Sequence, residues 1–218
     1  QIQADSTPEG IVRATIPHHE IVKMNQFEPA LLPQSFEVIK TNDEGKRMQQ
    51  SIIDAVQGTV SQNLASYLLQ SEQVRSAVGI EAKINKEDST KLEYAIGFMV
   101  EAYPDLSEKD LSIMEQVVLT LPPLHSFYKD GAFDLDGLLD ILRGPYEIEI
   151  IKEIEPHFHC PCSEERLLKS LSTLPEKDLK ELSSETKPLE IICDFCRTAY
   201  HIAPEKIKNI LTERKGLN

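Results

Sequence analysis

The first 104 residues alternate short runs of period-two apolar positions with one stretch of helical spacing. Partial alternation of β-branched and aromatic residues predicts strands over residues 2–4, 10–16, 36–40, 78–84 and 92–100. Four apolar residues share one helix face and predict a helix within residues 60–80: Val60, Leu64, Tyr67 and Leu68. Turn-forming residues at 8–10 and 42–45 separate the first strands. Residues 1–104 are therefore predicted to form one mixed α/β domain.

The pattern becomes helical after Pro104. Ser107 and the acidic residues behind it are typical of a helix N-terminus, and an apolar stripe follows: Leu111, Met114, Val117, Val118 and Leu121. A second short helix is predicted over residues 134–142, and alternating apolar and acidic residues predict a strand over 146–150. These small elements share no large apolar face. We therefore predict that residues 105–156 form a linker of modest stability, which opens more easily than the domain before it.

Residues 157–218 are predicted to form a small separate domain. Ser163 is suited to cap one helix, and Pro175 and Pro204 are suited to begin two more. Apolar runs at 189–192 and 199–202 predict a hairpin with a polar turn between its strands. The predicted fold class is α+β, with a mixed α/β N-terminal domain, a helical linker and a small C-terminal domain.

The charge of the chain bears on its partners. Its formal net charge is −13 over 218 residues, whereas phosphate backbones are bound by clustered Lys and Arg, so we expect no nucleic-acid partner. No run approaches the roughly 20 apolar residues that cross a bilayer, so we expect no membrane partner.

No signal peptide is visible, although the chain begins at Gln1 rather than Met. Four cysteines confined to one zone are more typical of a cytoplasmic protein than of a secreted disulfide protein.

All four cysteines lie in two close pairs, Cys160-Pro161-Cys162 and Cys193-Asp194-Phe195-Cys196. Thiols at this spacing either hold a metal ion or form disulfides. Two residues between Cys193 and Cys196 let both sulfurs face one point at a hairpin turn, and the other pair completes four thiolates for Zn²⁺. Such a site has no open position for water. It therefore predicts a structural zinc ion, bound by Cys160, Cys162, Cys193 and Cys196, in a zinc-binding C-terminal domain.

The same thiols are open to oxidation. Either pair can close a disulfide, which would release the metal and remove the main support of a domain of about 60 residues. The alternative is a permanent structural zinc site without a redox role. The residues alone leave both readings open.

Other residues that suggest chemistry have simpler explanations. Three histidines near the cysteines would compete with a complete four-sulfur set, so we expect them to be solvated or hydrogen-bonded: His157, His159 and His201. Adjacent His18 and His19 would point to opposite faces of a strand. Four carboxylates are expected to be solvated rather than catalytic: Glu147, Glu149, Glu153 and Glu155. No spacing indicates a nucleophile and base or an open metal site, so we expect no enzyme.

The sequence around the cysteines resembles a known family. Residues 158–166 (FHCPCSEER) and 193–200 (CDFCRTAY) closely resemble the signature of the heat-shock protein 33 family, which are redox-switched holdase chaperones of the stress response. Residues 71–73 and 97–104 also resemble family stretches. The resemblance covers about residues 60–205, and the start of the chain more weakly.

The resemblance implies a mechanism. In the reduced state the four cysteines would bind one Zn²⁺, the C-terminal domain would be folded, and the docked linker would hide apolar surface. Oxidation would form Cys160–Cys162 and Cys193–Cys196 disulfides, expel zinc, and unfold both parts so that unfolding client proteins can bind. No ATP is implied. The alternative function is a structural zinc-ribbon module for protein interactions, without redox switching.

The resemblance also bears on the N-terminus. Family members begin upstream of the segment that matches Gln1, so the N-terminal domain is expected to be shortened here. That domain forms the family's dimer, which leaves a homodimer of this chain open.

Overall fold

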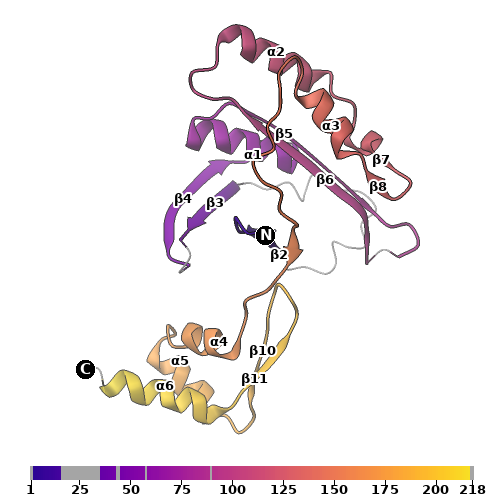
Figure 1. Ribbon diagram of the computed structural model, residues 1–218. Helices are drawn as coiled ribbons and strands as arrows, with labels where there is room; N and C mark the ends of the chain where they lie inside the picture. The colour runs from indigo at the N-terminus through magenta and orange to yellow at the C-terminus, as the bar shows by residue number, and fades with distance from the viewer. Residues whose placement is uncertain (1, 16–34, 43–44, 57, 89, 217–218) are drawn as a thin grey trace. The chain divides into compact units, whose positions relative to one another are not determined.

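The computed structural model describes residues 2–15, 35–42, 45–56, 58–88 and 90–216 (Figure 1). The chain divides into two compact units. The cysteine unit consists of the described residues of Gln1–Asn25 and Lys152–Asn218, and the ribbon unit consists of those of Gln26–Ile151. Helices and mostly antiparallel strands occur in both, which confirms the α+β class. The domain boundaries at residues 104 and 156 stay predictions.

The described part of the ribbon unit contains two long antiparallel ribbons, one short antiparallel strand pair and three α-helices. β3 (Ser35–Thr41) pairs with β4 (Arg47–Asp54), and β5 (Ser76–Ile84) pairs with β6 (Leu92–Glu101). The remaining elements are α1 (Val60–Tyr67), a π-helical turn η3 (Leu68–Glu72), α2 (Glu108–Leu119), a 3₁₀ turn η4 (Leu124–Phe127), the short strands β7 (Tyr128–Lys129) and β8 (Ala132–Phe133), and α3 (Leu135–Leu142).

Helix α1 lies between the two ribbons (Figure 1). Ile53, Tyr67 and Leu68 are buried together there, against apolar residues of β3 and β5. The predicted helix within residues 60–80 ends at Glu72, because Gln73 adopts a left-handed conformation with φ 59°. Residues from Ser76 onward belong to β5, so the last part of that prediction was wrong.

The linker elements cover one side of the β5–β6 ribbon (Figure 1). One buried cluster combines residues from β6, η4 and α3: Ile96, Leu124, Phe127, Leu138 and Leu142. The prediction that these elements share no large apolar face was therefore wrong. Each element contributes only one or two of these side chains, so the shared face arises when the elements meet. Residues 146–150 do not form the predicted strand, and Ile148 and Ile150 are exposed.

A polar contact also ties η4 to the β5–β6 ribbon. The Glu81 carboxylate accepts hydrogen bonds from the Tyr94 hydroxyl at 2.8 Å and from the backbone N–H of His125 at 3.0 Å. The His125 ring nitrogen Nδ1 also lies 3.0 Å from this carboxylate. Burial raises the pKa of Glu81, but these hydrogen bonds outweigh burial and hold the pKa below its ordinary value. The linker is thus docked by a charged carboxylate as well as by apolar contact.

This contact predicts an acid-sensitive stability. A carboxylate whose pKa is lower in the folded state stabilises the fold above its unfolded-state pKa, and this stabilisation is lost as the pH falls through the folded-state pKa. We expect wild-type protein to lose more stability between about pH 5 and about pH 3 than Glu81→Gln does. Urea unfolding followed by circular dichroism measures this. Glu115→Gln, on the exposed side of α2, is the control, and a pH profile of Glu81→Gln that matches the wild type would contradict the assignment.

The cysteine unit combines a small sheet, a hairpin and three helices. β1 (Gln3–Ser6) pairs antiparallel with β2 (Ile11–Thr15), which pairs parallel with β9 (His157–Phe158). The remaining elements are α4 (Glu164–Leu171), α5 (Glu176–Ser184), β10 (Leu189–Ile192), β11 (Ala199–Ile202) and α6 (Pro204–Gly216). The predicted hairpin is confirmed by the antiparallel β10–β11 pair.

The core of the cysteine unit joins the hairpin to the helices. Leu179, Ile202 and Ile207 are fully buried, and Leu171 and Ile210 complete the cluster. Ser163 caps α4, because its hydroxyl accepts a hydrogen bond from the backbone N–H of Arg166. The cap therefore fixes where the chain that carries Cys160 and Cys162 enters the helix.

Candidate metal centre

Two short segments of the cysteine unit carry the four cysteines. Cys160 and Cys162 lie between β9 and α4, and Cys193 and Cys196 lie in the turn between β10 and β11. The turn is closed by two hydrogen bonds, from the Cys193 N–H to the Thr198 carbonyl and from the Arg197 N–H to the Cys193 carbonyl, both 2.9 Å. Arg197 is left-handed, with φ 60°. This tight turn brings both of its sulfurs toward the other pair.

The four sulfurs form one cluster, with all Sγ atoms within 4.8 Å of one another. The Sγ atoms of Cys160 and Cys193 lie 3.7 Å apart, and those of Cys162 and Cys196 lie 3.3 Å apart. Tetrahedral zinc–thiolate bonds of about 2.3 Å place the sulfurs about 3.8 Å apart. The four cysteines are therefore positioned to hold a metal ion, and their donor set fits zinc. The sequence prediction that the two pairs meet is confirmed.

Two side chains, Tyr200 and Arg13, donate hydrogen bonds to sulfurs of the cluster. The Tyr200 hydroxyl lies 3.1 Å from both the carbonyl oxygen and the sulfur of Cys162. The contact with Cys162 raises the pKa of Tyr200 to about 12, so this hydroxyl remains a donor. The Arg13 guanidinium donates to Cys160 Sγ at 3.6 Å. Donors of this kind stabilise sulfur in its thiolate form, which is the form that binds metal.

The thiols differ in acidity. Hydrogen bonds with the side chain and the backbone of Thr198 lower the pKa of Cys196 to about 6. Tyr200 lowers the pKa of Cys162, but the neighbouring Cys196 sulfur and burial together raise it to about 12. Burial raises the pKa of Cys160, yet hydrogen bonds from Cys162 and Arg13 bring it below its ordinary value. Thiolates at this distance repel one another, and a divalent cation at the centre offsets that repulsion.

The histidines and glutamates that the sequence suggested as further chemical groups do not belong to this cluster. His157, His159 and His201 are exposed, and among the described residues the four cysteines are the group arranged to hold a metal ion. Glu147, Glu149, Glu153 and Glu155 are exposed too, as expected. His18 and His19 lie outside the described residues.

Sequence reasoning missed the neighbours of the cluster. Tyr200 and Thr198 belong to the hairpin that carries the second pair, so their closeness could have been inferred from the strand pairing. Arg13 precedes Cys160 by 147 residues, and no local pattern connects them.

Comparison with known proteins identifies the family of the chain. The sequence model of the Hsp33 protein family matches residues 1–203. This chain belongs to the Hsp33 family. Over 164 residues it is 30% identical to the 33 kDa chaperonin of Streptococcus gordonii, which covers 75% of this chain and 56% of that protein. It is 31% identical to the 33 kDa chaperonin of Lactococcus lactis subsp. cremoris over 159 residues, which is 73% of this chain and 54% of that protein.

The chain thus spans about half the length of these Hsp33 relatives. A crystal structure of the 33 kDa chaperonin from Thermotoga maritima, a heat shock protein 33 homolog, aligns with a TM-score of 0.74 and 23% identity. The alignment covers 99% of this chain and 74% of that one, and it shows a shared fold. Within the described residues, no helix combines the length and apolar character needed to cross a membrane.

Proposed function

We propose that this Hsp33-family chain is a redox-regulated holdase chaperone, which binds unfolding proteins after its four thiols are oxidised. The single observation that carries the proposal is the meeting of four cysteine sulfurs within 4.8 Å. The relatives named 33 kDa chaperonin support the chaperone part. The proposed activity is binding rather than catalysis.

In the reduced state, Cys160, Cys162, Cys193 and Cys196 would hold one Zn²⁺. The ion would supply a crosslink between the segment before α4 and the β10–β11 turn, and it would neutralise thiolate charge. Tyr200 and Thr198 would orient the sulfurs of Cys162 and Cys196. With four sulfur ligands no position stays open for a substrate, so the site suits a structural and switching role.

Oxidation would remove the ligands. A peroxide molecule accepts two electrons from two thiols, which join as one disulfide while two water molecules form. Two disulfides thus consume two peroxides and all four metal ligands. We propose the pairing Cys160–Cys162 and Cys193–Cys196. The reduced cluster also brings Cys160 close to Cys193 and Cys162 close to Cys196, so peptide mapping of the oxidised protein by mass spectrometry is needed to identify the pairs.

The surface for clients would come from the linker. Residues 105–156 carry the cluster-forming side chains of η4 and α3, which are buried against β6. Three isoleucines near the end of the linker, all in the ribbon unit, are already exposed, and Ile151 is 90% exposed: Ile148, Ile150 and Ile151. Release of the docked elements would add the buried side chains to this apolar surface. That combination is suited to bind unfolded chains, which expose apolar residues.

The proposal also covers the domain boundaries, the cellular location and the partners of the chain. We propose the domain boundaries 1–104, 105–156 and 157–218, and a cytoplasmic location, where thiols stay reduced until stress. The partners would be unfolding client proteins, without nucleic acid or membrane. Dimerisation is a separate proposal, to be tested by light scattering of the reduced protein.

Peroxide treatment tests the proposed function. We expect the reduced protein to contain one zinc ion, peroxide to release it to a chromogenic chelator, and the oxidised protein to suppress aggregation of a denatured client. A reductant should reverse the thiol change. Zinc release without any gain in aggregation suppression would contradict the chaperone reading. Zinc that peroxide does not release would favour the alternative, a permanent zinc-ribbon interaction module.

A further inference from the structure

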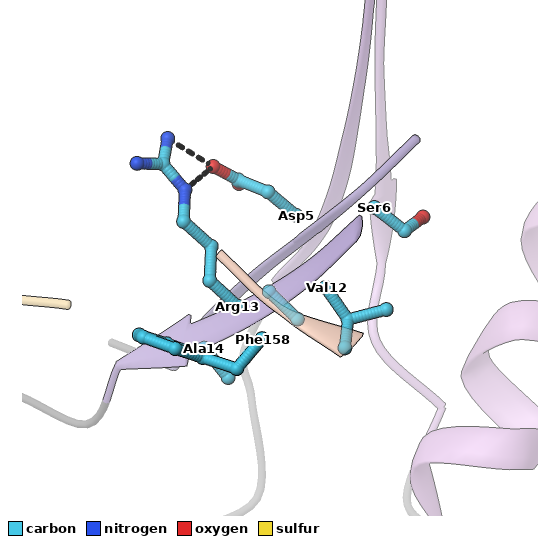
Figure 2. Close-up of a pocket in the computed structure, with 7 residues that line it drawn as sticks. Asp5, Ser6, Val12, Arg13, Ala14 and Phe158 are labelled. Carbon is cyan, nitrogen blue, oxygen red and sulfur yellow. Dashed lines mark hydrogen bonds and ion pairs between the residues drawn. The ribbon is translucent and has the colours of Figure 1, made fainter. Parts of the chain in front are cut away.

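The side chain of Arg13 links the β1–β2 hairpin to the metal centre. Its Nε and Nη2 atoms donate to Oδ2 of Asp5 at 2.8 and 2.6 Å, as Figure 2 shows. Its Nη1 atom donates to Cys160 Sγ at 3.6 Å. The guanidinium carbon lies 4.0 Å from the centre of the Phe195 ring. One side chain thus contacts a carboxylate, a sulfur and an aromatic face.

These contacts reach both cysteine pairs. Cys160 belongs to the first pair, and Phe195 lies between the two cysteines of the second. The planar guanidinium can pair with a carboxylate along one edge, donate from its other nitrogen and stack on a ring, which an ammonium group cannot do at once. The Arg13 side chain is 24% exposed, so its contacts are only partly screened by water.

The hairpin is attached at further points. The Thr15 hydroxyl donates to the carbonyl oxygen of Asp194 at 2.9 Å, in the same turn as Phe195. On the other side, β2 pairs with β9, and the His157 N–H donates to the Gly10 carbonyl at 2.9 Å. Gly10 has φ +88°, and a Cβ there would lie 2.5 Å from the Ile154 side chain, so glycine is needed for this approach. The β1–β2 hairpin is therefore hydrogen-bonded both to the segment before Cys160 and to the turn between Cys193 and Cys196.

We propose that Arg13 is a positioning residue of the metal centre, through which the β1–β2 hairpin holds the two cysteine pairs together in the reduced state and is released when the thiols are oxidised. This rests on the proposed function. A thiolate is a strong acceptor for a guanidinium, whereas a disulfide sulfur is neutral and a poor acceptor. Oxidation would therefore remove the acceptor that Arg13 uses at Cys160, and movement of the second pair would remove its ring contact.

Zinc transfer from the reduced full chain tests the role of Arg13. We expect Arg13→Gln to pass zinc to a chromogenic chelator about tenfold faster than wild type, because the charge-assisted bond and the stacking are both lost. Arg13→Lys keeps the charge and should restore part of the difference. Arg75→Gln, which removes an arginine paired with Glu108 in the ribbon unit, should transfer zinc at the wild-type rate.

Hydrogen exchange supplies a second measurement. We expect amides of β1 and β2 to be protected in reduced wild type, and to exchange at least several-fold faster after oxidation or in Arg13→Gln. A zinc-loaded Arg13→Gln that matches wild type in transfer rate and in hairpin protection would overturn the proposal. Wild-type protein that binds no zinc would overturn the proposed function itself. If, in addition, the amides of β1 and β2 are protected equally in wild type and in Arg13→Gln, the role of Arg13 is overturned as well.

Discussion

Cys162→Ser is expected to abolish stoichiometric zinc binding and to unfold the part of the cysteine unit around the metal centre. Cys162 contacts Cys196 at 3.3 Å and Tyr200 at 3.1 Å, so its loss removes a ligand and a hydrogen-bonded neighbour together. Apparent zinc binding free energies of four-ligand structural sites are about 10–16 kcal/mol, which equals or exceeds the whole stability of a small domain, roughly 5–15 kcal/mol. A three-sulfur site should not retain enough of that energy to hold the two segments.

Two measurements follow for Cys162→Ser. Zinc content after dialysis against a chelator should fall from about one ion per chain to near zero. In hydrogen exchange, the amides of Cys193 and Arg197, which close the β10–β11 turn, should lose protection first. The helical core around Leu179 and Ile207 should exchange more slowly, because those side chains are fully buried without help from the metal.

Ser163→Ala is the matched control. It alters the neighbouring residue and removes the N-cap of α4, at a cost of about 1 kcal/mol, but it leaves all four sulfurs in place. We expect normal zinc content from it. A Cys162→Ser protein that keeps its zinc and its turn protection would contradict the assignment of Cys162 as a ligand.

Local signals in the sequence predicted the elements that depend on local chemistry. The caps at Ser107 and Ser163, the hairpin around the second cysteine pair and the helix of residues 134–142 all rest on short-range patterns, and the structure confirms them. The meeting of the two cysteine pairs was also predicted, because few roles other than a shared site explain thiols so clustered.

Features that depend on distant partners were missed. β4 (Arg47–Asp54) was missed for a different reason: its partner β3 is the preceding strand, but most residues of β4 are polar and show no apolar alternation. The alternation over residues 146–150 looked like a strand, but an alternating pattern says nothing about whether a partner strand is available. The contact of Arg13 with Cys160 and the shared core of β6, η4 and α3 could not be predicted either, because each joins segments with no common sequence pattern.

Leu138→Ala is expected to undock the linker and give aggregation suppression without any oxidant. Leu138 on α3 is 3% exposed and lies in the cluster with Ile96 and Phe127. Truncating a buried leucine to alanine typically costs about 2–5 kcal/mol. Because the linker elements are small, that loss should fall mainly on their docking to β6 rather than on the cysteine unit. Hydrogen exchange of α3 and η4, and client aggregation assayed with reduced protein, measure the two effects.

Two controls separate undocking from general destabilisation. Leu119→Ala removes a leucine that is 76% exposed and should change the unfolding free energy by less than about 0.5 kcal/mol, with no new activity. Leu179→Ala removes a fully buried leucine of the cysteine unit and should speed zinc loss, whereas Leu138→Ala should leave zinc in place. If Leu138→Ala loosens α3 and η4 but reduced protein still fails to suppress aggregation, release of the docked linker is not what exposes the client surface. Client binding would then depend on changes in the cysteine unit itself.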